Sequence, residues 1–174
     1  MLYVNEKTSK NKEMTSPTFS LPQSERINSK KQIDRLFRGG GSKAMTASPL
    51  RVVYMAEERG ENDGEPVAQP DEQPAPKKEP MAQMMVSVPK RFFKRAVKRN
   101  RIKRQVREAY RLNKHILTDE LDKAGHLKLS MCFIWTADRM LDTAEVEQRM
   151  TSLLNRLREK LHALPPKADN SKQM

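Results

Sequence analysis

PKRFFKRAVKRNRIKRQVREAYRL occupies residues 89–112, and about half of these residues are lysine or arginine. After Pro89, no glycine or proline interrupts the stretch. Its Ala, Arg, Lys, Gln, Glu and Leu residues all favour helical backbone. We therefore predict a single helix that begins near Arg95 and continues past Leu117.

Projected at about 100° per residue, this helix has two distinct faces. The apolar face consists of Ile102, Val106, Ala109, Tyr110, Asn113 and Leu117. The basic face, turned away from it, consists of Asn100, Lys103, Arg104, Arg107, Arg111 and Lys114. The apolar face predicts packing on a core. Like charges spaced i, i+4 repel each other, so the basic face predicts a polyanionic partner. A solvated surface or a localisation signal is the alternative for such a run, and the interleaved apolar face disfavours it.

Three ordered motifs in this region resemble the protein component of bacterial ribonuclease P. They are Val88-Pro89-Lys90-Arg91, Arg99-Asn100-Arg101-Ile102-Lys103-Arg104 and Arg107-Glu108-Ala109-Tyr110-Arg111-Leu112. The resemblance extends to an upstream segment with Glu25-Arg26-Ile27, Lys31, Ile33-Asp34-Arg35-Leu36-Phe37 and Gly40. It covers roughly residues 21–161, apart from an insertion described below.

The resemblance implies a role in tRNA processing. The family pairs with a large catalytic RNA and helps it to remove the 5′ leader of precursor tRNA endonucleolytically, which gives the mature tRNA 5′ end. On this basis we expect a ribonucleoprotein of one protein with one RNA, located in the cytoplasm. The RNA subunit would carry the hydrolysis and bind most of the Mg²⁺, while the protein alone would be inactive and would bind no cofactor tightly.

Composition agrees with a nucleic-acid partner. The 174 residues include 36% hydrophobic and 32% charged residues, with a net charge of +12. This balance predicts nucleic acid or an anionic membrane surface as the partner. No apolar run approaches the roughly 20 residues that span a bilayer, and Leu2-Tyr3-Val4 is too short for a signal-peptide core. Cys132 is the only cysteine, which excludes a disulfide framework and a cysteine-based metal site.

The chain divides into one predicted RNA-binding domain, residues 21–162, with a disordered N-terminal extension, 1–20, and a polar C-terminal tail, 163–174. Met1 and Met14 are both candidate starts. Within the domain, residues 57–80 form a proline-rich insertion with eight acidic and three basic residues. With no apolar pattern, this insertion is predicted to be disordered. It either shields the basic surface from wrong RNA or is simply tolerated, and the second interpretation is favoured.

The remaining pattern predicts an α+β fold, a small two-layer sandwich in the order helix, strands, helix, strand, helix, with an antiparallel or mixed sheet. Predicted helices span about 30–38, capped by Ser29 and ended by glycines, and from about Asp142 to a point before Pro165. Predicted strands cover 50–55, 81–88 and 127–136, with a possible edge strand at 42–46. A crossover between parallel strands is normally right-handed, whereas the family resemblance implies a left-handed one between residues 88 and 127.

No residue is predicted to be catalytic or to bind metal, because the three histidines are scattered and no paired carboxylates stand out. The basic helix is predicted to bind the catalytic RNA through Arg99, Asn100, Arg101, Lys103, Arg104 and Arg107. The family also has a leader-binding cleft between the first helix, the sheet and the start of the basic helix. Matching positions here are Ile33, Phe37, Tyr54, Lys90 and Arg91.

Two alternatives stay open at the level of residues. Phe37 fits either the cleft or the core, and Ile33 stands where the family often has phenylalanine. Phe92 and Phe93 fit either the cleft or the start of the helix. At the level of function, the alternative is a general RNA-binding protein of the ribosomal or chaperone type. A basic-zipper protein is rejected because Gly125 ends the helical pattern before any leucine heptads.

Overall fold

The computed structural model describes residues 20–59 and 80–164. Four strands form one sheet, β1 (Lys43–Ala47), β2 (Leu50–Glu58), β3 (Ala82–Ser87) and β4 (Leu127–Trp135), in the order β1-β2-β4-β3. The pairs β1–β2 and β2–β4 are antiparallel, whereas β3 and β4 are parallel. The mixed sheet confirms the predicted fold class, and β1 confirms the suggested edge strand.

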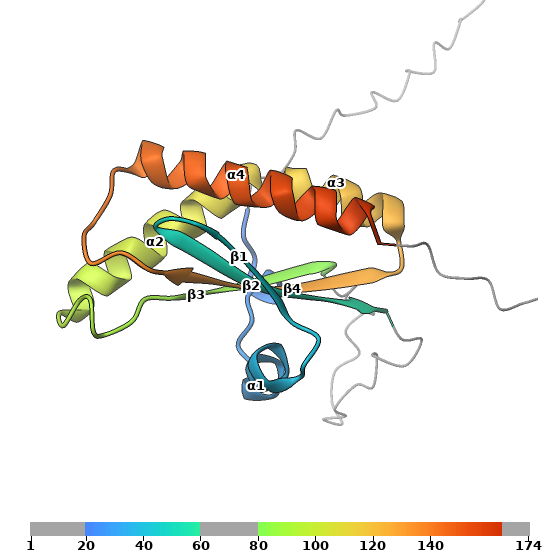
Figure 1. The fold of residues 1–174 in the computed structure, drawn as a ribbon, viewed down its shortest axis with the longest axis horizontal. Coiled ribbons are helices and arrows are strands. Elements are labelled where there is room, and N and C mark those ends of the chain that lie inside the picture. Colours follow the sequence, from blue (N-terminus) through green and yellow to red (C-terminus); the bar gives the residue numbers. More distant parts are fainter. Residues whose placement is uncertain (1–19, 60–79, 165–174) are drawn as a thin grey trace, which may run out of the picture.

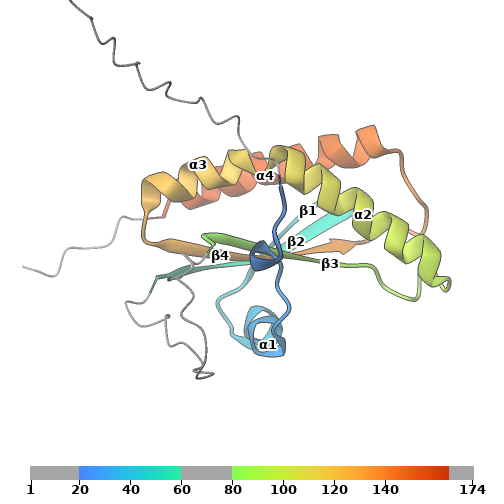
Figure 2. The ribbon, with the colours of Figure 1, turned by 180° about the vertical axis from the view of Figure 1, so that it is seen from behind.

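Helices lie on both faces of this sheet. They are α1 (Lys30–Arg38), α2 (Ala96–Asn113), α3 (His115–Ala124) and α4 (Thr143–His162), preceded by a short 3-10 turn, η1 (Gln23–Glu25). Figure 1 shows α2, α3 and α4 together over one face, with α1 alone beneath the other. From behind, α2 slopes down from this helix layer toward the level of the sheet at its N-terminal end (Figure 2). The molecule is therefore a two-layer sandwich with one additional helix on the opposite face.

The main core fills the space between the sheet and the three helices. The predicted apolar face of the basic helix is buried here, including Ile102, Val106 and Tyr110. Tyr110 meets Phe133 of β4 with ring centroids 5.8 Å apart. Because aromatic pairs at such distances add to the gain from burial alone, α2 is held on the sheet by large, specific contacts.

A second, smaller cluster lies between α1 and the sheet. Leu36 of α1 is fully buried against Met55 and Cys132. Side chains alternate between the faces of a strand, so β4 supplies Cys132 to this cluster and Met131 and Phe133 to the main core. This confirms that β4 is a central strand covered on both faces.

The structure corrects two predicted boundaries. The basic helix that was predicted to run past Leu117 is divided in two, because α2 ends at Asn113 and α3 begins at His115. Asn113, a weaker helix former than most of its neighbours, is the last residue of α2, and Lys114 at the break makes tertiary contacts that are described below. Strand β2 also continues through Glu57 and Glu58, which pair with Lys128 and Leu127, so these two residues belong to the sheet and not to a disordered insertion.

The rest of the predicted disordered extension (1–19) and insertion (60–79), and of the polar tail (165–174), lies outside the described residues. The two parallel strands, β3 and β4, are joined through α2 and α3. The left-handed crossover stays a prediction.

Candidate nucleic-acid interface

The outward side of α2 presents exposed cations. Asn100, Arg101 and Arg104 are exposed there around Val97, whose side chain is 79% exposed, and together they line a shallow hollow of about 390 Å³. Neither Arg101 nor Arg104 forms an ion pair with another described residue. Both guanidinium groups are therefore available to an anionic partner, and arginine forks match phosphate geometry.

Arg99 has a different environment from the other predicted RNA-binding residues. Its Nη1 donates hydrogen bonds to the backbone oxygens of Phe93 and Lys94, at 2.7 and 2.6 Å. Phe93 itself is buried in the main core. Arg99 thus holds the loop that precedes α2, which is a positioning role that the sequence motif did not reveal.

The flank of α2 that carries Lys103 and Arg107 is half-buried. Burial, and then the positive charge of Arg26, lowers the pKa of the Arg107 guanidinium. Lys103 and Arg107 share this flank because they are four residues apart on the helix, and Arg26 lies near enough for its charge to act on Arg107. A cluster of like charges held in this way favours an anion beside it.

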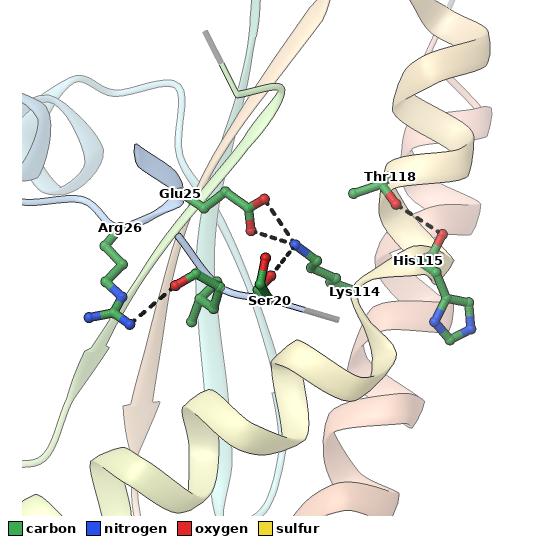
Figure 3. A network of polar contacts seen from close by, with 7 residues as sticks. Ser20, Glu25, Arg26, Lys114, His115 and Thr118 are labelled. Carbon is green, nitrogen blue, oxygen red and sulfur yellow. Dashed lines mark hydrogen bonds and ion pairs between the residues drawn. The ribbon is translucent and has the colours of Figure 1, made fainter. Parts of the chain in front are cut away.

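The N-terminal segment is fastened to the end of α2 by a polar network (Figure 3). Lys114 Nζ lies 2.9 Å from both carboxylate oxygens of Glu25 and donates to the backbone oxygen of Ser20 at 2.6 Å. Arg26 Nη2 donates to the backbone oxygen of Leu21 at 3.1 Å. This network holds Arg26 in place at the edge of the sheet. In the sequence, the resemblance of Glu25-Arg26-Ile27 to the family motif had marked this segment.

Backbone contacts complete this attachment. The Ile27 amide donates to the backbone oxygen of Met84 at 3.0 Å, so the segment after η1 lies along the free edge of β3. Pairing of this kind protects an edge strand from unwanted partners. It also sets the starting point of α1 relative to the sheet.

On the other face of the sheet, α1 presents a mixed surface. Leu36 points into the small cluster, whereas Phe37 is 49% exposed and Ile33 is half-buried. Ile33 and Phe37 are four residues apart and share one flank of α1. The exposure of Phe37 excludes the core interpretation and leaves an aromatic surface beside the sheet.

Two polar contacts fix the position of α1. Gln32 Nε2 donates to Gln83 Oε1 at 3.0 Å, and Gln83 Nε2 donates to the backbone oxygen of Ser24 at 2.8 Å. Arg35 forms an ion pair with Glu57 at 3.5 Å. One side chain of β3, Gln83, therefore connects α1 to the segment that carries η1.

Tyr54 does not join Ile33 and Phe37. It lies on the opposite face of the sheet, is 5% exposed and belongs to the main core, where burial raises the pKa of its phenol. The adjacent residues Val53 and Met55 are the ones that face α1. Side chains alternate along a strand, so the residues on either side of Tyr54 face α1 and Tyr54 does not.

The segment between β3 and α2 carries the remaining predicted cleft residues. Lys90 and Arg91 are exposed, and the Arg91 guanidinium carbon lies 4.6 Å from the centroid of the Phe92 ring. Phe93 is buried and Phe92 packs partly against the core. Phe93 therefore stabilises the start of the helix, and Arg91 is held by a cation–π contact in an exposed position.

Residues 20–59 and 80–164 also bear on two other features, a metal centre and a membrane-spanning helix. No group of three or more His, Cys, Asp or Glu side chains comes together there in a way that could hold a metal ion. We therefore assign no metal ligand to these residues. None of the helices in this part of the chain is both long and apolar enough to cross a membrane.

Comparison with known proteins gives consistent matches. The family model described as Ribonuclease P matches residues 21–158. Ribonuclease P protein components from two strains of Porphyromonas gingivalis are each 39% identical over 147 residues, covering 83% of this chain and 91% of those proteins. Among solved structures, the RNase P protein from Thermotoga maritima aligns with a TM-score of 0.49 and 19% identity, covering 76% of this chain and 96% of that chain. The same protein in complex with 1-(4-fluorophenyl)-2-thiourea aligns with a TM-score of 0.46 and 18% identity, covering 74% and 98%.

Proposed function

This chain belongs to the Ribonuclease P family, and from that premise we propose that it is the accessory subunit that binds the catalytic RNA and the 5′ leader of precursor tRNA. The observation that carries the proposal is the family match over residues 21–158. Two separate surfaces of the fold support it, one on α2 and one beside α1.

The outward face of α2 is proposed to bind the catalytic RNA. Asn100, Arg101 and Arg104 are exposed, and both arginines lack ion pairs with the described residues. Lys103 and Arg107 add charge on one flank of the helix. Each phosphate that these cations neutralise would steepen the dependence of log K on log salt by about 0.7 to 0.9.

The flank of α1 that carries Ile33 and Phe37 is proposed to bind the leader, together with Val53 on the sheet and the exposed Lys90 and Arg91. An aromatic side chain stacks on any unpaired base. Lysine and arginine follow the phosphates without reading the sequence. Such a surface suits an enzyme that must accept leaders of many sequences.

Chemistry at the scissile bond is proposed to belong to the RNA subunit. As the family resemblance implies, Mg²⁺ would be bound mainly by the RNA, and this chain would supply no catalytic group. The active complex would contain one protein and one RNA and would act in the cytoplasm on precursor tRNA.

The direct test is cleavage of precursor tRNA at low Mg²⁺ by the protein, by bacterial ribonuclease P RNA, and by both together. We expect efficient cleavage by the mixture. Cleavage by the protein alone would contradict the assignment of chemistry to the RNA. A mixture no faster than the RNA would instead favour a general RNA-binding protein.

Phe37→Ala is expected to weaken the binding of precursor tRNA to the holoenzyme by about 1–3 kcal/mol, the value of one base stacked on an aromatic ring. Binding of mature tRNA should not change, because it has no leader. Phe37→Tyr, which keeps the ring, is the matched control and should behave like the natural protein. Equal losses for precursor and mature tRNA would remove Phe37 from the leader surface.

A further inference from the structure

The face of the sheet that α4 covers holds a pocket that neither proposed RNA surface uses. It has a volume of about 150 Å³ and lies between β1, β2 and the end of α4. Tyr54 of β2 lines it, together with Lys43 of β1 and Lys160 of α4. Lys43 and Tyr54 are paired across the two strands, and such partners lie side by side on one face of a sheet. The pocket therefore brings a phenol and two ammonium groups together from three different elements.

The hydroxyl of Tyr54 has no partner within the described part of the chain. The residue is only 5% exposed, and its hydroxyl forms no hydrogen bond with any residue of 20–59 or 80–164. Burial raises the pKa of this phenol above its usual value, so the hydroxyl keeps its proton at neutral pH. Buried polar groups normally have partners. This donor is therefore suited to an acceptor atom that enters the pocket.

The charge around this hydroxyl is positive. Lys43 and Lys160 are exposed, and neither forms an ion pair with a described residue. No carboxylate is among the described residues that line the pocket. Lys160 lies in the last turn of α4, where a cation offsets the partial negative charge of the helix end. Three hydrogen-bond donors, two of them charged, thus surround one small hollow, and this set favours an oxyanion.

The size of the pocket limits the kind of oxyanion that it admits. Its volume of about 150 Å³ is roughly half of the smallest sites for drug-sized molecules, which begin near 300 Å³. A single phosphate group fits such a space, whereas a whole nucleotide is too large. Lysine binds phosphate as a point charge, and tyrosine hydroxyls donate to phosphate oxygens in nucleic-acid complexes.

We propose that Tyr54, Lys43 and Lys160 form a phosphate-binding site. The phosphate belongs either to the backbone of an RNA strand or to free inorganic phosphate, and the two sources have different consequences for RNA binding. The site itself does not depend on the proposed function, whereas an RNA source rests on it.

The pocket lies far from the exposed arginines of α2. Gln105 of α2 donates to the backbone oxygen of Leu141 and to Thr143 at the start of α4, at 2.8 and 3.2 Å. The pocket is at the other end of α4, and a helix of 20 residues is about 30 Å long. Figure 1 accordingly shows the end of α4 and the start of α2 at opposite ends of the molecule. A phosphate bound here would be a contact separate from the outward face of α2.

The test is a titration of the full-length protein with inorganic phosphate at constant ionic strength, with chloride as the reference anion. The amide resonances of Gly41 and Ala56 report binding, because both residues line the pocket and stay the same in every variant. We expect a saturable shift with phosphate and none with chloride. Tyr54→Phe keeps the ring in the core and should weaken phosphate binding about tenfold, since one hydrogen bond to a charged group is lost.

Two double variants separate the pocket from general effects of charge. Lys43→Gln/Lys160→Gln should abolish the saturable shift without altering the core. Arg149→Gln/Arg158→Gln removes the same charge from exposed positions of α4 outside the pocket and should titrate like the natural protein. No saturable shift in the natural protein, or an unchanged titration in Lys43→Gln/Lys160→Gln, would overturn the phosphate site.

Binding of the same proteins to ribonuclease P RNA identifies the source of the phosphate. With an RNA phosphate in the pocket, Lys43→Gln/Lys160→Gln should lower the slope of log K against log salt by about 0.7 to 0.9, whereas Arg149→Gln/Arg158→Gln should not. An unchanged slope, with the phosphate titration positive, would assign the site to free phosphate. Absence of any stimulation of cleavage would overturn the proposed function, while the titration of the free protein would still decide the phosphate site.

Discussion

Arg101→Glu combined with Arg104→Glu is expected to weaken assembly with ribonuclease P RNA at least about a hundredfold, because two charge-assisted contacts of about 1.5–3 kcal/mol each are lost and replaced by repulsion. Both side chains are exposed on α2 and form no ion pair with the described residues. Their charge therefore does not stabilise the described part of the fold through an ion pair. Helical content and thermal stability should therefore remain close to those of the natural protein.

The dependence of RNA binding on salt provides a second measure of the surface formed by Arg101 and Arg104. For the milder variant Arg101→Ala/Arg104→Ala, the slope of log K against log salt should fall by about 1.4 to 1.8, which corresponds to two released phosphate contacts. Arg149→Ala/Arg158→Ala, on exposed positions of α4, is the matched control and should keep the slope. Equal slopes for the two double variants would show that α2 is not the RNA-binding face.

Arg99 is deliberately left unchanged in these variants. Its hydrogen bonds to the backbone of Phe93 and Lys94 hold the loop before α2. Removing it would disturb the start of the helix and the placement of Arg91 together with any contact to RNA. A loss of affinity in Arg99→Ala would thus combine two effects, whereas Arg101 and Arg104 report on the surface alone.

Leu36→Ala is expected to reduce the free energy of unfolding by about 2–5 kcal/mol, as for other large-to-small changes at fully buried sites. Leu36 is the only α1 side chain that is fully buried, and it packs on Met55 and Cys132. The change should loosen α1 from the sheet, which urea denaturation and amide hydrogen exchange would report. The amides of the main core, on the other face, should lose protection only by this change in global stability, whereas those of α1 should also exchange by local opening.

Cys132 supplies a chemical probe of whether α1 loosens from the sheet. Burial raises the pKa of its thiol to about 12, and only the thiolate reacts with thiol reagents. Labelling at neutral pH should therefore be very slow in the natural protein and much faster in Leu36→Ala. Phe37→Ala is the neighbouring control, since that side chain is half exposed and its loss should leave labelling slow. Slow labelling in both variants would mean that Leu36 does not hold α1 in place.

Sequence patterns predicted the elements of this fold well. The helix at Lys30–Arg38 has the predicted bounds, and the predicted apolar face of α2 is buried with Ile102, Val106 and Tyr110 at its centre. These features depend on local spacing, which the sequence contains directly. At the break between α2 and α3, Lys114 contacts Glu25, which is 89 residues away, and Asn113 before it is only a weak local signal.

The candidate site was less accessible to sequence reasoning. Exposed basic residues such as Arg101 and Arg104 were identified, because charge density is a property of composition. The face of the sheet on which Tyr54 lies was not identified. Side chains alternate along a strand, so a shift of one residue moves a side chain to the opposite face. Gln83 carries no motif, and its role depends on what α1 contacts after folding.

The placement of α1 and α2 on opposite faces of one sheet (Figure 1) has a consequence for affinity. If α2 holds the ribozyme and α1 holds the leader, the two contacts never compete for the same surface, and a rigid layer of strands fixes the distance between them. Once the tRNA body is bound by the ribozyme, the leader meets α1 intramolecularly, at an effective concentration that reaches the millimolar range for short linkages. Contacts that would be too weak to capture a free oligonucleotide are then sufficient to distinguish a precursor from its product, and a product without a leader leaves without having to break them.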